Sequence, residues 1–139
     1  MLLKVDISNA FNTVSRNSFL RAVAEELPDL LPFVLSCYAR HSTLLFGAHE
    51  IPSVEGAQQG DPLGPLLFSL ALRRVWAEFL PECSPCIWGA FYVDDGVLAG
   101  NVAAVRSTFD AFRTACSRHG LRINTDIIMR SGSPAEVGG

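Results

Sequence analysis

Residues 91–100, FYVDDGVLAG, place two adjacent aspartates, Asp94 and Asp95, at the end of an apolar run. The residues before this pair predict a strand, and residues 97–99 predict a second strand that returns beside the first. Neighbouring side chains of a regular strand point to opposite faces of the sheet, so both acids can serve one site only where the chain bends. Two interpretations follow: a hairpin whose Asp-Gly turn needs positive φ, or one half of a metal site. Taken alone, these ten residues favour the turn.

The composition of the chain indicates one domain with a sizeable core. It has 139 residues, of which 49% are hydrophobic and 18% are charged. No apolar run in the sequence approaches the ~20 residues of a membrane helix, so we expect no membrane partner. The net charge of −3 argues against a free-standing nucleic-acid-binding protein, which normally carries a basic surface. It does not exclude an active-site module whose basic parts lie elsewhere.

Four cysteines in so apolar a chain do not indicate a disulfide framework. We therefore expect a reducing compartment, nuclear or cytoplasmic.

Hydrophobic periodicity predicts a mixture of helices and short strands. Strands are expected over 2–7 and 121–124, and hairpins over 42–57 and 86–100. Helices are expected over 19–27, 30–38 and 102–116, and a further helix is expected to start with Asp61 as its cap and Pro62 in its first position. This order predicts an α+β fold, in which helices pack on one face of a small antiparallel sheet. Residues 1–125 would form the domain, and the divergent residues 126–139, rich in Gly, Ser and Pro towards the end of the chain, would form a disordered tail.

Three carboxylates lie at strand ends in this arrangement. Asp6 ends the first strand, and if that strand pairs with the later hairpin, Asp6, Asp94 and Asp95 meet on the open face of the sheet. Three like charges at close range repel one another unless a cation neutralises them. Carboxylate oxygens suit Mg²⁺ or Mn²⁺, and two such ions about 3.5–4 Å apart clamp the attacking and leaving oxygens of a phosphoryl transfer. Considered singly, Asp6 is an ordinary strand end and Asp95 an ordinary turn residue.

Three short motifs resemble those of reverse transcriptases. VDISNAF resembles the D-x-x-x-A-F motif of that family, QQGDPLGPLLF resembles its Q-G-x-x-L-S-P-x-L-F motif, and FYVDD resembles its Y-x-D-D box. The motifs occur in the family's order, and they look most like those of non-LTR retrotransposons and related mobile elements. The resemblance as a whole covers roughly residues 2–124. The resemblance implies the palm domain of an RNA-directed DNA polymerase.

The resemblance also implies roles for the acids. Asp6 and Asp94 would ligate two Mg²⁺ or Mn²⁺ ions, and Asp95 would lie beside them with a lesser catalytic and metal-binding role. The backbone carbonyl of Ile7 would complete the shell of one ion.

Four further residues match positions that contact the substrates in that family. Phe11 matches the steric gate, a ring that excludes the 2′-hydroxyl of a ribonucleotide. Gln59 and Gly60 match the contact with the incoming nucleotide, and Tyr92 would lie near the primer end. From the residues alone, a core aromatic is the preferred interpretation of Phe11, and Tyr92 is about equally well explained as a strand-packing aromatic.

The implied reaction is attack of a primer 3′-hydroxyl on the α-phosphate of a deoxynucleoside triphosphate, with an RNA template and a DNA primer as partners. The chain is expected to be a fragment whose fingers and thumb belong to other segments of a longer polyprotein, and to be weakly active or inactive alone. Two positions depart from the family pattern: Gly64 stands where many relatives have Ser, and Ile127 stands where Lys is expected.

Two other functions remain open at this point. One is a non-catalytic remnant of a mobile element that acts at most as an interaction module. The other is the palm of an RNA-dependent RNA polymerase, against which Phe11 as a sugar gate argues.

Overall fold

A computed structural model describes residues 1–58, 60–83, 87–124 and 130–131. In chain order, the elements are β1 (Leu2–Ser8), α1 (Ala10–Thr13), α2 (Arg16–Glu26), the 3₁₀ helix η1 (Pro28–Leu30), α3 (Leu31–Tyr38), β2 (Ser42–Phe46), β3 (His49–Ser53), α4 (Gly64–Phe79), the 3₁₀ helix η2 (Leu80–Glu82), β4 (Trp88–Tyr92), β5 (Asp95–Ala99), α5 (Val102–Arg118), β6 (Arg122–Ile123) and β7 (Arg130–Ser131). The mixture of helices with a small antiparallel sheet confirms the predicted α+β class.

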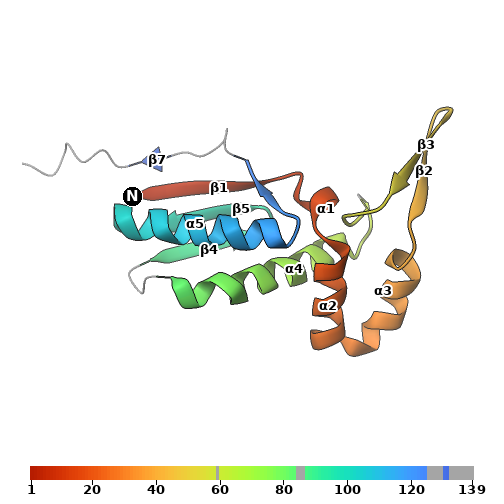
Figure 1. Cartoon of the computed structure of the whole chain (residues 1–139), viewed down its shortest axis with the longest axis horizontal. Helices are drawn as coiled ribbons and strands as arrows, with labels where there is room; N and C mark the ends of the chain where they lie inside the picture. Colours follow the sequence, from red (N-terminus) through yellow and green to blue (C-terminus); the bar gives the residue numbers. More distant parts are fainter. Residues whose placement is uncertain (59, 84–86, 125–129, 132–139) are drawn as a thin grey trace, which may run out of the picture.

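The main sheet has the strand order β4-β5-β1-β6, and β7 also pairs with β1. Each of these pairings is antiparallel. Strands β2 and β3 form a separate hairpin that projects beyond α2 and α3, away from the main sheet (Figure 1). The segment between β1 and α4 therefore forms the far end of the molecule from the N-terminus.

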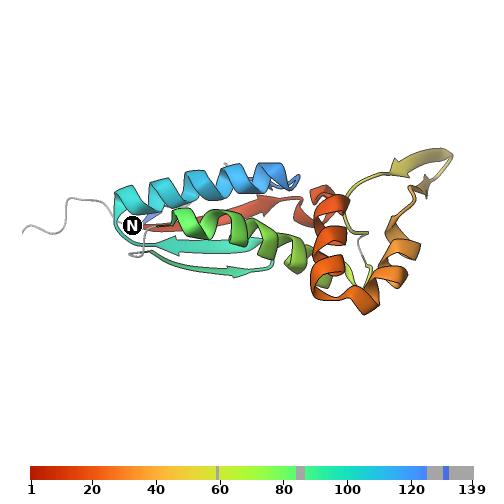
Figure 2. The ribbon, with the colours of Figure 1, turned by 60° about the horizontal axis from the view of Figure 1, so that its bottom comes forward.

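The main sheet has one buried face and one open face. Along β1 the residues Leu3, Val5 and Ile7 are buried, whereas Lys4 and Asp6 point to the opposite face and are partly exposed. Helices α4 and α5 lie along the sheet (Figure 2). Four aromatic rings from α4, β4 and α5 contact one another in this layer: Trp76, Phe79, Phe91 and Phe112. The apolar side chains that alternate along β1 therefore lie on the face of the sheet that the helices cover.

Helix α4 begins later than predicted. It starts at Gly64 rather than at Pro62, with Pro65 in its first turn. The predicted cap, Asp61, accepts a hydrogen bond at 2.9 Å from the N–H of Leu63, which precedes the helix. Asp61 therefore stabilises a tight turn in front of α4, and this turn delays the start of the helix.

The turn of the β4–β5 hairpin also differs from the Asp-Gly turn that the sequence favoured. Tyr92 pairs with Asp95, so Val93 and Asp94 form the turn, and Asp95 and Gly96 lie inside β5. A Cβ atom on Gly96 would lie 2.2 Å from the ring of Phe91, its cross-strand partner. Gly96 is therefore required by the packing of that ring.

Within the predicted tail, the structure describes Arg130 and Ser131. They form β7 and pair with Leu3 and Leu2. Disorder of the tail as a whole stays a prediction. The backbone groups along the edge of β1 explain the pairing, because an open strand edge can accept a further strand. Residues 125–129 and 132–139, including Ile127, lie outside the described residues.

Candidate active site

Asp6, Asp94 and Asp95 meet at one end of the main sheet. In the β1–β5 ladder Asp6 is the direct partner of Asp95, which places both side chains on the same, open face. The ladder continues into the turn, where the N–H of Ile7 donates to the carbonyl oxygen of Asp94 at 3.0 Å. Positions 87 and 89 residues apart in the chain are therefore neighbours in the ladder.

Two of these acids have polar contacts of their own. Lys4, one strand repeat before Asp6, places its Nζ 3.4 Å from Oδ1 of Asp95. Asn124 donates to Oδ2 of Asp6 at 3.1 Å through its side chain, and to the carbonyl oxygen of Asp6 at 2.8 Å through its backbone N–H. Because Lys4 and Asp95 are both well exposed, the ion pair between them contributes little stability.

The donor set suits a hard divalent cation. It consists of three carboxylates and the backbone carbonyl of Ile7. The N–H of Ile7 points towards β5, and because the N–H and C=O of a strand residue point to the same side, its carbonyl also faces β5. Among the described residues, however, no group of three or more His, Cys, Asp or Glu side chains is close enough to hold a metal ion as it stands. The backbone gathers the acids at one end of the sheet, but their side chains do not converge on one point.

Val93, between Tyr92 and the acids, has an unusual backbone conformation. Its φ is +56°, in the left-handed region that β-branched residues rarely adopt. Such a conformation costs on the order of 1–2 kcal/mol and persists only when the surroundings impose it. Here the surroundings are the strand pairs β4–β5 and β1–β5. They impose the left-handed conformation on Val93, because β5 must leave the turn with Asp95 paired to both Tyr92 and Asp6.

Phe11 and Gly60 line the same pocket, although they are 49 positions apart in the sequence. The pocket has a volume of about 410 Å³, and its other lining residues are Gln58, Asp61, Pro62, Gly64 and Pro65. Gly60 has a φ of +87° and open space where a side chain would be. The ring of Phe11 is half-buried and packs against Phe68 at a centroid distance of 5.0 Å. Phe11 therefore both packs on the core and lines the pocket.

Backbone contacts hold the two walls of this pocket together. The N–H of Ala57 donates to the carbonyl oxygen of Phe11 at 2.7 Å, and the N–H of Gly56 donates to that of Val14 at 3.0 Å. Gly56 has a φ of +72°, and a Cβ there would lie 2.3 Å from the carbonyl oxygen of Asn12. Only glycine permits so close an approach of the two segments.

The remaining predicted residues are placed differently. Tyr92 is 84% exposed, so it does not pack against the sheet as an ordinary strand aromatic. Its backbone partner is Asp95, which puts it beside the acids. Gln59 lies outside the described residues.

Sequence analysis missed a buried polar pair behind the pocket. Tyr38, in an apolar helix that resembles a core segment, donates from its hydroxyl to Oδ2 of Asp61. Burial and this hydrogen bond raise the pKa of Tyr38 to about 12. The only signal in the sequence was the presence of a hydroxyl in an otherwise apolar run.

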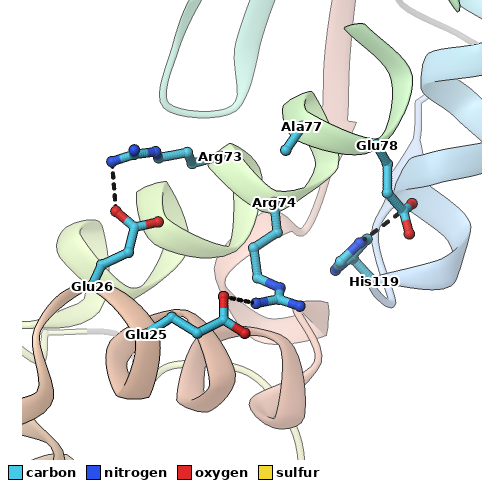
Figure 3. A pocket seen from close by; sticks show the side chains of 7 residues that line it. All are labelled: Glu25, Glu26, Arg73, Arg74, Ala77, Glu78 and His119. Atoms are coloured by element: carbon cyan, nitrogen blue, oxygen red, sulfur yellow. Dashed lines mark hydrogen bonds and ion pairs between the residues drawn. The ribbon is translucent and has the colours of Figure 1, made fainter. Parts of the chain in front are cut away.

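A second pocket, of about 390 Å³, lies among α2, α4 and the end of α5 (Figure 3). Most of its charged side chains are paired with one another. Arg73 contacts Glu26, Arg74 contacts Glu25, and His119 contacts Glu78. We therefore regard this pocket as part of the packing between helices rather than as the active site.

None of the described helices is long and apolar enough to cross a membrane.

Known proteins resemble this chain along nearly all of its length. The family model described as "Reverse transcriptase (RNA-dependent DNA polymerase)" matches residues 1–126. The chain is 29% identical over 132 residues to the Retrovirus-related Pol polyprotein from type-1 retrotransposable element R2 of Bradysia coprophila, and 28% identical over 120 residues to that of Nasonia vitripennis. It is 28% identical over 138 residues to the corresponding polyprotein from type-2 retrotransposable element R2DM of Drosophila melanogaster. These matches cover 82–90% of this chain and 12–15% of the relatives, so the chain spans a small part of the curated relatives' length.

Proposed function

Because the chain belongs to the reverse transcriptase family, we propose that it forms the catalytic palm of an RNA-directed DNA polymerase from a mobile element similar to R2. The observation that supports this most directly is the pairing of Asp6 with Asp95 next to the Asp94 turn. It brings three hard carboxylate ligands to one end of the two central strands, an arrangement that suits nucleotidyl transfer. The Phe11–Gly60 pocket supports the same proposal, because it unites two of the predicted nucleotide-binding residues.

In the proposed reaction, the 3′-hydroxyl of a DNA primer attacks the α-phosphate of a deoxynucleoside triphosphate. A phosphoester bond forms, the bond to the β-phosphate oxygen breaks, and pyrophosphate leaves. Base pairing with the RNA template selects the nucleotide. The protein contributes mainly positioning and neutralisation of charge, as in other phosphoryl transfers.

The residues of the chain have distinct proposed roles. Asp6, Asp94 and the carbonyl of Ile7 hold two Mg²⁺ or Mn²⁺ ions, with Asp95 beside them. Bound ions of this kind neutralise the charge that develops on the transferred phosphoryl group.

Four residues are assigned to the substrates. The ring of Phe11 excludes the 2′-hydroxyl of a ribonucleotide, and Gly60 allows the backbone to approach the nucleotide closely. Gln59 is assigned to the nucleotide and Tyr92 to the primer end by the family motif. An exposed Tyr92 ring beside the acids is consistent with contact to a nucleic acid base, since aromatic side chains stack on bases.

The chain spans 12–15% of the length of its R2 relatives. The activity of the isolated chain is therefore part of the proposal. We expect the isolated chain to bind a deoxynucleoside triphosphate with Mn²⁺ and to extend a primer weakly or not at all. The fingers and thumb that hold template and primer would come from other segments of a longer polyprotein.

The proposal is tested by the binding of a deoxynucleoside triphosphate to the 139-residue chain with and without Mn²⁺, measured by calorimetry. We expect Mn²⁺-dependent binding that is lost in Asp94→Asn and Asp6→Asn and kept in Asp29→Asn, an exposed acid on η1. A primer-extension assay on the same variants measures the transfer of deoxynucleotides to a primer.

Two results would contradict the proposal. If the wild-type chain binds neither Mn²⁺ nor nucleotide, the non-catalytic remnant becomes the better description. If Phe11→Val leaves the preference for deoxyribonucleotides over ribonucleotides unchanged, Phe11 is not the sugar gate. The RNA polymerase alternative is not favoured, since the matching family is that of RNA-dependent DNA polymerases.

A further inference from the structure

A buried hydroxyl outside the three motifs contacts both ends of the pocket loop, by which we mean Gln58, Gly60 and Asp61. Tyr38, the last residue of α3, is only 3% exposed. Its hydroxyl donates to Oδ2 of Asp61 and accepts a hydrogen bond at 3.2 Å from the N–H of Gln58. The loop also closes on itself, because the N–H of Asp61 donates to the carbonyl oxygen of Gln58 at 3.1 Å. Tyr38 thus acts as a bridge across the base of the loop.

Asp61 transmits this contact to the start of α4. Its Oδ1 accepts from the N–H of Leu63 at 2.9 Å, and its carbonyl oxygen accepts from the N–H of Gly64 at 2.9 Å. One carboxylate therefore connects α3 to the turn that carries Pro62 and leads into α4. Asp61, Pro62 and Gly64 all line the Phe11 pocket, so the wall opposite Phe11 depends on this carboxylate.

Arg16 supports the same arrangement from the other side. It is 9% exposed, and its guanidinium lies over the ring of Tyr38, with Cζ 5.3 Å from the ring centroid. Its Nε donates to the carbonyl oxygen of Gly56 at 3.1 Å, and Nη2 donates to Oγ of Ser53 at 2.9 Å. The ring of Tyr38 is therefore fixed by a cation that also holds the chain just before the pocket loop.

The hydroxyl of Tyr38 is suited to this task chemically. A group with a pKa of about 12 remains protonated at neutral pH, so it donates to Asp61 while its lone pairs accept from Gln58.

We propose that Tyr38 is a positioning residue, which holds the pocket loop at a set distance from Phe11 and thereby sets the affinity of the pocket for a deoxynucleoside triphosphate. The claim that Tyr38 sets the nucleotide affinity rests on the function proposed above. The claim that Tyr38 holds the pocket loop rests on the contacts of Tyr38 alone. Tyr38 does not line the pocket with Phe11 and acts only through Gln58 and Asp61.

The test compares wild type with Tyr38→Phe and with a control, Ser36→Ala. Phenylalanine keeps the ring against Phe19, where the centroids are 5.3 Å apart, and beneath Arg16, so only the hydroxyl is lost. Ser36 lies on the same helix, is exposed, and donates to the carbonyl oxygen of Phe33 away from the pocket. Cooperative thermal unfolding of each variant verifies that the chain is folded.

Hydrogen exchange of peptides that cover residues 57–64 measures the holding role without any nucleotide. We expect about tenfold faster exchange in Tyr38→Phe, because the two hydrogen bonds of the hydroxyl, to Asp61 and from Gln58, are lost, and no change in Ser36→Ala. In the double variant Tyr38→Phe/Asp61→Ala the two effects should be less than additive, because Asp61→Ala already removes the Tyr38–Asp61 hydrogen bond and Tyr38→Phe then removes only the contact with Gln58. Unchanged exchange in Tyr38→Phe, or fully additive effects in the double variant, would overturn the proposal.

Calorimetric binding of the nucleotide with Mn²⁺ measures the affinity role. We expect the dissociation constant to rise about five- to tenfold in Tyr38→Phe and to stay the same in Ser36→Ala. Equal affinity of wild type and Tyr38→Phe would refute the link to the nucleotide. If the wild-type chain binds no nucleotide while Tyr38→Phe exchanges faster, the proposed function fails and the holding role of Tyr38 stands, so the two failures are distinguishable.

Discussion

Asp6 and Asp95 lie directly opposite each other in the antiparallel β1–β5 ladder, with both side chains on the open face of the sheet. Like charges in this position destabilise a sheet. Asn124 contacts Asp6 and Lys4 contacts Asp95, but both acids remain partly or largely exposed. A pair of this kind is useful where a cation binds, and the sheet tolerates it at a small energetic cost.

Mn²⁺ should stabilise the folded chain if the acids hold it. A ligand that binds only the folded state raises the unfolding temperature with its concentration. We expect such a rise in wild type and in Asp29→Asn, and little or none in Asp6→Asn or Asp94→Asn. Differential scanning calorimetry at several Mn²⁺ concentrations measures it. An equal rise in all four proteins would mean that the ion binds elsewhere.

Gly96→Ala should destabilise the hairpin that carries the acids. The added Cβ would lie 2.2 Å from the ring of Phe91, which packs on Trp76 and Phe112 and has little room to move. Overpacking of this kind costs about 1–3 kcal/mol, which urea unfolding measures. In the double variant with Phe91→Leu the two effects should be less than additive, since the smaller side chain vacates the space. Additive effects would show that the ring is not the cause.

Arg16→Met should cost far more stability than Arg73→Met. Arg16 is buried and donates to the chain at Ser53 and Gly56, and a methionine would leave these acceptors without their donor. We expect a loss of about 2–4 kcal/mol. Arg73 pairs with Glu26 at the surface, where such a change is worth roughly 0.5 kcal/mol or less. Urea unfolding of both variants measures the difference, and similar small losses would contradict the buried role of Arg16.

His119 should make stability depend on pH. Its Nδ1 is 2.5 Å from Oγ of Ser18 and its Nε2 is 3.5 Å from Oε2 of Glu78, with the cations Arg74 and Arg118 nearby. Burial lowers the pKa of His119 below its ordinary value of 6.5. The unfolded chain therefore binds the proton more readily, so this contribution is complete above about pH 6.5 and is lost as the pH falls from there through the folded pKa.

Thermal unfolding between about pH 8 and about pH 5.5 tests this dependence. We expect the decline in unfolding temperature on acidification to be smaller in His119→Gln than in wild type. His41→Gln serves as the control, because His41 is exposed and should leave the slope unchanged. The same slope in His119→Gln and wild type would exclude His119 as the source.

Cys116 should be unreactive in the folded chain. It is fully buried, and burial raises the pKa of its thiol to about 12, so very little thiolate is present at neutral pH. Cys37 is exposed and should react at once with iodoacetamide. Mass spectrometry of peptides before and after denaturation measures both. Rapid alkylation of Cys116 under native conditions would show that α5 opens readily.

Much of the fold follows from local patterns. The alternation of Leu3, Val5 and Ile7 along β1 and the periodic apolar positions Val105, Phe112 and Cys116 of α5 each indicate the element and its buried face. The turn at Val93 and Asp94 does not follow in this way, because Asp-Gly is the better local turn. The packing of Phe91 over Gly96 and the pairing of Asp95 with Asp6 outweigh it.

For the candidate site, the sequence by itself determined which residue types are present: the carboxylates, the glycine and the aromatic ring, each recognisable from its motif. Tertiary structure alone decided that Asp6 lies opposite Asp95, that Phe11 shares a pocket with Gly60, and that the hydroxyl of Tyr38 contacts both Gln58 and Asp61. The physical reason is that motif chemistry is local, whereas strand pairing and buried hydrogen bonds join residues from distant parts of the chain. Their partners are selected only when the whole core packs.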